Sequence, residues 1–120
     1  MDISKKIAEL KKDEKFAENV GMILIHNGIV RGTKREDGSP VSKLEVKADR
    51  EKIAAIAGDI EAMDGIYKVV AEAIDGVMVP GDDLLYLIVC GDIRENVKPA
   101  LALLLDRIKS EAVTKKEYGI

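Results

Sequence analysis

The apolar run Leu84–Cys90 constrains the fold of this chain more than any other segment. It reads LLYLIVC, contains no charged residue, and is followed directly by GDIRENVKP. A short continuous apolar run between turn-forming residues is typical of a strand that is buried on both faces. The turn after it carries Arg94 into the start of an expected helix. The sequence therefore predicts a central strand covered on both sides, and raises the question of whether Arg94 belongs to a turn or to a site.

Three segments have apolar residues at helical spacing. An amphipathic N-terminal helix is expected within residues 1–19, and a second helix follows Asp49, a good N-cap, and ends at Asp64-Gly65. The third segment, RENVKPALALLLDRIKSEA, contains Pro99. Proline is tolerated in the first turn of a helix, so this helix is expected to start near Glu95 to Lys98.

Four strands are expected, in VGMILIHNGIVRG, VSKLEVKA, IYKVVAEAI and LLYLIVC. Gly28 inside the first strand indicates a bulge or a close backbone approach. DGVMVPGDD is interpreted as a connection and residues 113–120 as a short polar tail. The predicted order is α-β-β-α-β-β-α in one domain over residues 1–120. Helices do not alternate with single strands, so an α+β fold with a mixed sheet and flanking helices is favoured over a doubly wound parallel fold.

Composition excludes several classes of function. The net charge of −3 and an aromatic content of 3% argue against nucleic-acid binding. No apolar stretch approaches the ~18 residues that span a bilayer, and no signal peptide is recognised, so a cytoplasmic protein without membrane contact is expected. The single cysteine, Cys90, is expected to be a buried, inert thiol. With one histidine, His26, and one cysteine, no metal site and no resident cofactor are expected.

The remaining candidates for chemistry are basic. They are Arg31, Lys34, Arg35, Arg94, Lys109, Lys115 and Lys116. Each alone is more often a solvated surface charge. Together they suit an anionic ligand, because guanidinium groups bind phosphate or carboxylate and a desolvated lysine can act as a base or a nucleophile.

The order of several motifs resembles one known family. GMILIHNGIVRG is followed by KLE before a helix, then by VPGDDLLYLIVCGDIR, LLLDRIK and KKE. This order, over roughly Gly21 to Glu117, is similar to the large, catalytic subunit of molybdopterin synthase. The resemblance implies an α/β hammerhead-type fold and a homodimer. It also implies docking of a small ubiquitin-like sulfur-carrier subunit, whose Gly-Gly thiocarboxylate delivers sulfur to a cyclic pyranopterin monophosphate.

The resemblance also implies roles for the basic residues. Lys109 matches the catalytic lysine that ends a D-x-x-K motif, and Arg31 and Arg94 match arginines that follow strands. The second catalytic lysine is Lys116 by spacing from Lys109, which we prefer here, or Lys115 by alignment of the Lys-Lys-Glu motif. Lys34 and Arg35 are grouped with the anion-binding candidates.

The sequence departs from the family at several positions. Ile93 stands where a histidine is usual, and Ala73-Ile74-Asp75-Gly76 replaces a His-Arg-x-Gly motif. Val113 and Thr114 replace a proline and an aromatic residue, and the chain stops at Ile120, before the family's C-terminal extension. Two hypotheses therefore stay open: an active sulfurtransferase subunit, and a non-catalytic paralogue that keeps the fold and dimer and binds a pterin or a carrier protein. A generic anion-binding α+β domain is a third.

Overall fold

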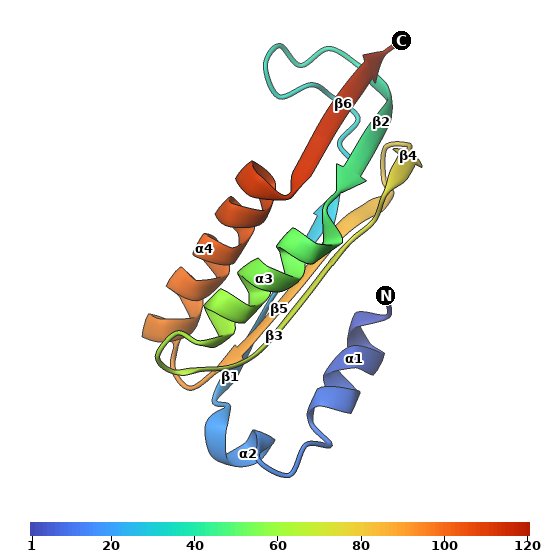
Figure 1. Ribbon diagram of the computed structural model, residues 1–120. Helices are drawn as coiled ribbons and strands as arrows, with labels where there is room; N and C mark the ends of the chain where they lie inside the picture. Colours follow the sequence, from blue (N-terminus) through green and yellow to red (C-terminus); the bar gives the residue numbers. More distant parts are fainter.

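The computed structural model describes residues 1–120, which form an elongated molecule of 51 × 26 × 25 Å. The helices are α1 (Ile3–Leu10), α2 (Phe16–Asn19), α3 (Arg50–Glu61) and α4 (Arg94–Glu111). The strands are β1 (Met22–Ile29), β2 (Val41–Ala48), β3 (Ile66–Ala73), β4 (Gly76–Met78), β5 (Asp83–Gly91) and β6 (Val113–Gly119). The predicted α+β class is confirmed (Figure 1).

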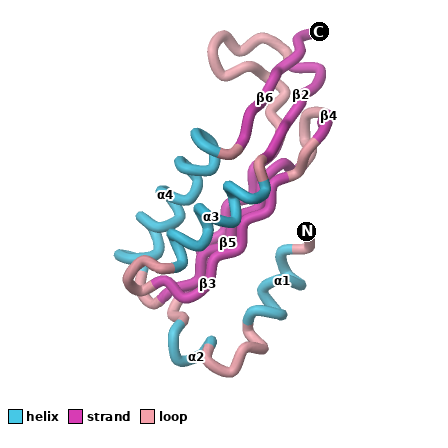
Figure 2. Tube along the Cα trace, viewed as in Figure 1, coloured by secondary structure: helices cyan, strands magenta, loops and turns pink.

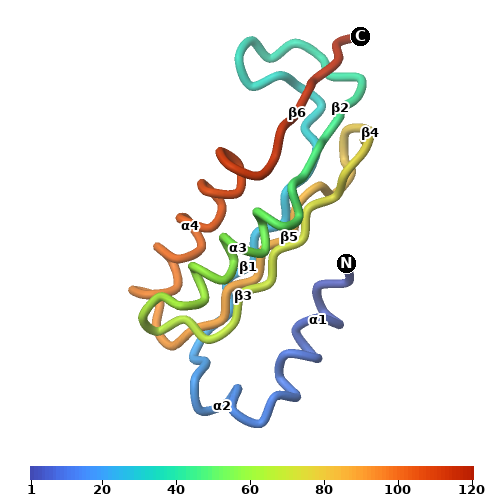
Figure 3. The backbone as a smooth tube through the Cα atoms, in the orientation of Figure 1, coloured from blue at the N-terminus to red at the C-terminus, as the bar shows by residue number.

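The strands form two antiparallel sheets with the orders β1-β5-β3 and β4-β2-β6, in place of the mixed sheet that the sequence predicts. Helices α3 and α4 lie side by side against one face of the first sheet, whereas α1 lies on the other side of it (Figure 1). The second sheet extends beyond the helices toward the C-terminus, as the strand colouring in Figure 2 shows. The chain trace in Figure 3 shows the N-terminal segment running back along the first sheet.

Strand β5 is the central strand, as its unbroken apolar run predicts. Leu85, Leu87 and Val89 pack with α3 and α4 in the main hydrophobic cluster, which includes Ile56 and Leu104. The alternate residues Tyr86, Ile88 and Cys90 lie on the opposite face and are also buried. Helix α1 lies along that face and half-buries the apolar side chains Ile3, Ile7 and Leu10. Both faces of β5 are therefore covered.

Several local signals act as predicted. The Asp49 side chain accepts a hydrogen bond from the Lys52 N–H at 3.0 Å and caps α3. Gly65, at φ 77°, turns the chain toward β3 in the left-handed region that glycine tolerates, but α3 itself ends at Glu61, before the predicted stop at Asp64-Gly65. The register of β1 against β5 shifts between Gly28 and Ile29, which confirms the predicted irregularity at Gly28.

Close backbone approach requires two further glycines where β1 begins and β5 ends. The Gly21 N–H donates to the Gly91 carbonyl at 2.8 Å, and the Asp92 N–H donates to the Gly65 carbonyl at 2.9 Å. A Cβ on Gly91 would lie 2.5 Å from the Gly65 carbonyl oxygen, and a Cβ on Gly21 would collide with the Asp92 carbonyl. At the turn after the apolar run, the backbone segments around Gly21, Gly65 and Gly91 therefore pack too closely to leave room for a side chain on Gly21 or Gly91.

The prediction that Pro99 lies in the first turn of its helix is wrong. Helix α4 begins at Arg94, so Pro99 is its sixth residue. The Asp92 carboxylate accepts hydrogen bonds from the Ile93 N–H at 2.6 Å and from Asn96 Nδ2 at 2.9 Å. The Ile93 carbonyl also accepts from the Asn96 and Val97 N–H groups. These contacts start the helix upstream of the proline.

The predicted order α-β-β-α-β-β-α misses two strands and one helix break. Residues 113–120, interpreted as a polar tail, contain β6, and the connection DGVMVPGDD contains β4. Both strands pair with β2, and β6 has a polar sequence because most of its side chains are exposed. The N-terminal helix is two helices, since the chain turns at Asp13, whose carboxylate accepts from the Lys15 N–H.

Candidate functional site: a basic cleft beside the end of α4

A cleft of about 430 Å³ lies between the end of β1, the last turn of α4 and the inner face of β6. Its lining combines apolar side chains with a cluster of cations. The residues are Ile29, Val30, Arg31, Thr33, Arg35, Leu44, Leu84, Lys109, Lys115 and Glu117. Four of the seven basic candidates from the sequence therefore lie in one place. Arg31 and Arg35 follow β1, whereas Lys109 and Lys115 lie on α4 and β6, which are directly connected (Figure 1).

Strand alternation decides which of the two neighbouring lysines reaches this cleft. Lys115 pairs with Val46 in the β2–β6 ladder, and Val46 is only 2% exposed. Residues paired across an antiparallel ladder share a face, so Lys115 lies on the same face as the buried Val46, although Lys115 itself is an exposed residue. Lys116 pairs with Glu45 on the outer face. It lies outside the cleft, with its Nζ 5.2 Å from the centre of the Tyr118 ring.

None of the four cations of the cleft forms an ion pair, although the Glu117 carboxylate also lines the cleft. The ion pairs of the structure involve other basic residues, namely Lys6, Arg50, Lys52, Arg94 and Arg107. Desolvation lowers the pKa of Lys115, and the positive charge of Lys109 lowers it further, while Glu117 acts in the opposite direction. A cluster of unpaired cations can bind an anion. A lysine whose pKa is lowered can also supply a neutral amine.

The structure does not bring Lys34 or Arg94 to the cleft. Lys34 lies in a turn, where its N–H donates to the Ser39 carbonyl at 2.8 Å. Arg94 begins α4 and Lys109 lies in its last turn, which separates them by roughly 22 Å along the helix axis. The Arg94 side chain is 77% exposed and pairs with Glu95 at 3.0 Å. Within one chain, Arg94 therefore belongs to the first turn of α4 and not to the cleft.

Two residues near the lysines were not among the basic candidates. Glu117 lines the cleft two residues after Lys115, on the same face of β6. His26 lies on β1, and the charges of Lys109 and Lys115 add to desolvation in lowering its pKa. Alternation along each strand could have indicated both residues, but only once residues 113–119 were known to be a strand.

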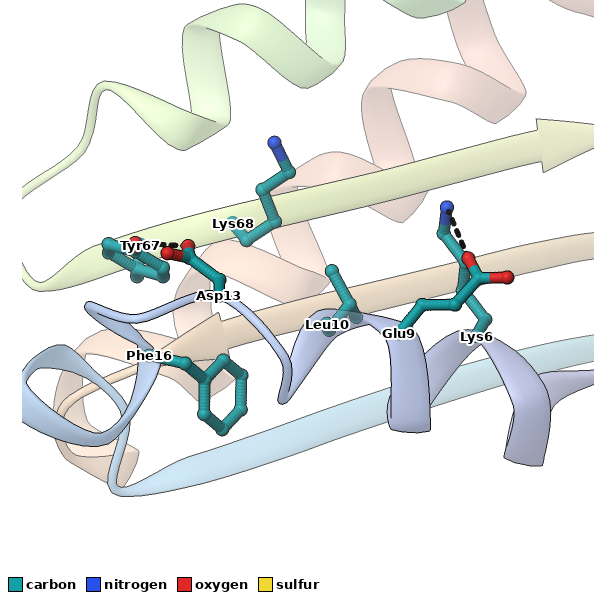
Figure 4. Close-up of a pocket in the computed structure, with 7 residues that line it drawn as sticks. All are labelled: Lys6, Glu9, Leu10, Asp13, Phe16, Tyr67 and Lys68. Atoms are coloured by element: carbon teal, nitrogen blue, oxygen red, sulfur yellow. Dashed lines mark hydrogen bonds and ion pairs between the residues drawn. The ribbon is translucent and has the colours of Figure 1, made fainter.

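A second pocket, of about 210 Å³, lies between α1, α2 and β3 (Figure 4). Its charged groups are largely paired with each other: Lys6 with Glu9 at 3.7 Å, and the Tyr67 hydroxyl with the Asp13 carboxylate. Figure 4 shows both contacts beside Leu10 and Phe16. The contacts around this pocket hold the N-terminal helices against the sheet, and they leave few charged side chains free to bind a ligand.

Other reactive groups do not form a site. Cys90 is buried, as predicted, and burial raises the pKa of its thiol to about 11. No group of three or more histidine, cysteine or acidic side chains is arranged to hold a metal ion. None of the helices combines the length and the apolar character that crossing a bilayer requires.

A protein-family model and a curated protein both match this chain in sequence. The family model described as MoaE protein matches residues 1–111. A probable molybdopterin synthase of Haloferax volcanii is 28% identical over 116 residues, which are 92% of this chain but 44% of that protein. The chain thus spans less than half the length of this curated relative.

Solved structures share the fold. The molybdopterin cofactor biosynthesis protein E of Burkholderia multivorans has a TM-score of 0.76 at 21% identity, covering 100% of this chain and 82% of that one. A Helicobacter pylori structure described as the complex of subunits 1 and 2 of molybdopterin-converting factor has a TM-score of 0.68 at 16% identity. It covers 98% of this chain and 78% of its own.

Proposed function

Since the chain belongs to the MoaE protein family, we propose that it acts in molybdenum cofactor biosynthesis as the sulfur-transferring subunit of a molybdopterin synthase. The reaction would move sulfur from the C-terminal thiocarboxylate of a small ubiquitin-like carrier protein to a cyclic pyranopterin monophosphate, giving molybdopterin. We further infer that residues 1–120 act as one cytoplasmic domain.

The convergence of Arg31, Arg35, Lys109 and Lys115 in one cleft carries this proposal. The proposed reaction has two anionic reactants, a phosphate monoester and a thiocarboxylate, and needs a basic group beside them. Guanidinium groups bind such oxyanions with two parallel hydrogen bonds. The cleft supplies unpaired cations for binding and a lysine of lowered pKa for chemistry.

We assign the two lysines different roles. Lys109 acts as an ammonium group that binds the anion, and its charge favours the neutral amine of Lys115. Neutral Lys115 serves as the base or the nucleophile. The inward position of Lys115 favours it over Lys116, which the spacing from Lys109 had favoured. Arg31 and Arg35 bind the phosphate or carboxylate group.

A partner and a second copy of the chain complete the proposed assembly. The similar fold in the Helicobacter pylori complex of two subunits supports a small carrier protein as the partner. Arg94 lies at the opposite end of α4 from Lys109. If Arg94 binds the same ligand, a second copy must supply it, which is consistent with a homodimer.

Reconstitution tests the proposal. The chain is mixed with a thiocarboxylated carrier protein and the cyclic pyranopterin monophosphate, and formation of the dithiolene product is followed. Lys109→Ala should lower the rate by about 10²–10³-fold, the range for loss of one group that stabilises negative charge in the transition state. The absence of turnover with an authentic carrier, or full activity in Lys109→Ala, would contradict the proposal.

The non-catalytic paralogue stays a second candidate because of Ile93. This residue stands where the family usually has a histidine, is 52% exposed, and caps α4 without a side-chain hydrogen bond. A paralogue would bind the pterin or the carrier without transferring sulfur. Binding measured by calorimetry together with no product in the reconstituted assay would favour this candidate.

A further inference from the structure

His26 points toward the basic cleft from the adjoining strand. It lies on β1 opposite Leu87, and Gly28 is the next residue on the same face. The His26 Nε2 atom lies 3.5 Å from the position that a Cβ on Gly28 would take. The imidazole therefore extends along the strand, over the residue that has no side chain, toward Ile29, Val30 and Arg31, which line the cleft.

The charged groups around His26 are cationic. Helix α4, which packs against β1, contributes Lys109, and β6 contributes Lys115. Strand β5 contributes the apolar Leu85 and Leu87. Desolvation, followed by the two lysine charges, lowers the pKa of His26. Without a ligand the ring is thus neutral near pH 7 and offers no charge to the cleft.

We propose that His26 is a further ligand-binding residue of the cleft, which becomes protonated when an oxyanion binds and donates a hydrogen bond from Nε2 to it. The negative charge of the ligand offsets the charges of Lys109 and Lys115, so protonation no longer adds an unopposed cation. The proton comes from solvent or from a phosphate monoanion, whose second pKa of ~6 lies close to that of imidazole. Only the choice of a phosphate monoester or a thiocarboxylate as the natural ligand rests on the proposed function.

The single histidine makes the test direct, because its ring proton signals need no assignment among several histidines. The titration of His26 is followed by proton NMR in the full chain, without ligand, with inorganic phosphate, and with the dipeptide Gly-Gly. We expect the pKa to rise in the presence of the bound anion. A rise with phosphate alone identifies a phosphate site, and a rise with Gly-Gly alone identifies a carboxylate site.

A variant series gives a second readout. The phosphate affinity of His26→Gln should fall about tenfold at pH 6, where the charged hydrogen bond forms, and change little at pH 8. Lys98→Gln is the matched control, since Lys98 is an exposed cation of α4 that does not line the cleft. The wild-type titration needs no variant, so misfolding of His26→Gln leaves the test in place.

Two results would overturn the inference: phosphate and Gly-Gly both leave the pKa of His26 unchanged, or His26→Gln loses no more affinity at pH 6 than at pH 8. The reconstituted sulfur-transfer assay is scored separately. If sulfur transfer is absent while the titration of His26 still responds to phosphate, the proposed function fails and the inference about His26 holds.

Discussion

Lys115 lies directly across the β2–β6 ladder from the buried Val46, while its neighbour Lys116 lies across from Glu45 on the exposed face. The two lysines are adjacent in sequence and both border a pocket with Glu45 and Lys47, but only Lys115 also lines the basic cleft. Lys115 shares a cleft with Lys109 and has a lowered pKa. Lys116 lies over the Tyr118 ring. Since both residues are lysines, any difference between their variants reflects the face of β6 on which each side chain lies.

Exchanging each lysine for alanine should separate the two positions. We expect Lys115→Ala to lower the rate of sulfur transfer by about 10²–10⁴-fold, because it removes the proposed base. We expect a much smaller loss in Lys116→Ala, because its ammonium group lies on the other face of β6. Single-turnover rates in the reconstituted assay measure both. Equal losses, or a larger loss in Lys116→Ala, would reject the assignment of Lys115.

The pH dependence of the rate should respond to the neighbours of Lys115 with opposite signs. The rate is expected to rise with pH as Lys115 loses its proton. The charge of Lys109 lowers the pKa of Lys115, so Lys109→Gln should move this rise to higher pH. Glu117 acts in the reverse sense, so Glu117→Gln should move it to lower pH. Rate profiles of the three proteins check the signs, and shifts in the same direction would contradict the proposed role.

Stability should fall on acidification in two separate ranges. The pKa of His26 is lower in the folded chain than its ordinary 6.5, so below about pH 6.5 the unfolded chain binds more protons and the free energy of unfolding decreases. The lowered carboxyl pKa values of Asp83, Asp92 and Glu111 cause a further decrease at still lower pH. Urea midpoints from pH 8 to pH 3 measure both ranges. His26→Gln should remove the upper one and leave the lower one in place.

Two glycine substitutions should change stability in opposite directions. A Cβ on Gly91 would lie 2.5 Å from the Gly65 carbonyl oxygen and 2.6 Å from Val97 Cγ2. Gly91→Ala should therefore cost about 1–3 kcal/mol through overpacking. Gly58 lies inside α3 with nothing within 4 Å of an added Cβ, so Gly58→Ala should stabilise by about 0.5–1 kcal/mol. Denaturant unfolding measures both changes. An unchanged free energy of unfolding in Gly91→Ala would contradict the close backbone packing at this position.

The contact between Asp13 and Tyr67 should appear in the titration of the tyrosines. Hydrogen bonding to the Asp13 carboxylate is the main cause that raises the pKa of Tyr67 to about 12. Asp13→Asn should bring it back toward the ordinary value near 10. Absorbance of the phenolate, with Tyr67→Phe to identify the signal, measures the change. An unchanged titration in Asp13→Asn would show that α1 and α2 are not attached to β3 through this contact.

Strong patterns in the sequence predicted much of the fold. The apolar run Leu84–Cys90 is the buried centre of β5, and Asp49 caps α3. Strands β4 and β6 were missed because pairing with β2, and not an apolar pattern of their own, makes them strands. The start of α4 was predicted too late because the prediction relied on Pro99. Hydrogen bonds to the Asp92 carboxylate start the helix earlier, and the preference of proline for the first turn does not take them into account.

The sequence indicated residue types for the candidate site, but it did not indicate how those residues are arranged. The resemblance to the family drew attention to Arg31 and Lys109, and the structure places both in the cleft. The choice between Lys115 and Lys116 needed the alternation of β6, which a segment interpreted as a tail does not have. In the sequence, His26 was considered only as a metal ligand, because its charged neighbours come from α4 and β6 and not from its own strand.

Because Lys115 and Lys116 are adjacent, a one-residue deletion near the start of β6 would still leave a lysine facing the cleft. Helix α4 ends at Glu111 and β6 begins at Val113, so almost no loop separates Lys109 from the strand. Loss of Thr114 would move every later residue by one ladder position and so exchange the faces of the strand. Lys116 would then occupy the inward position, with Tyr118 in place of Glu117. A one-residue deletion that would remove the inward amine from most sequences would here keep the amine and lose the acidic neighbour instead.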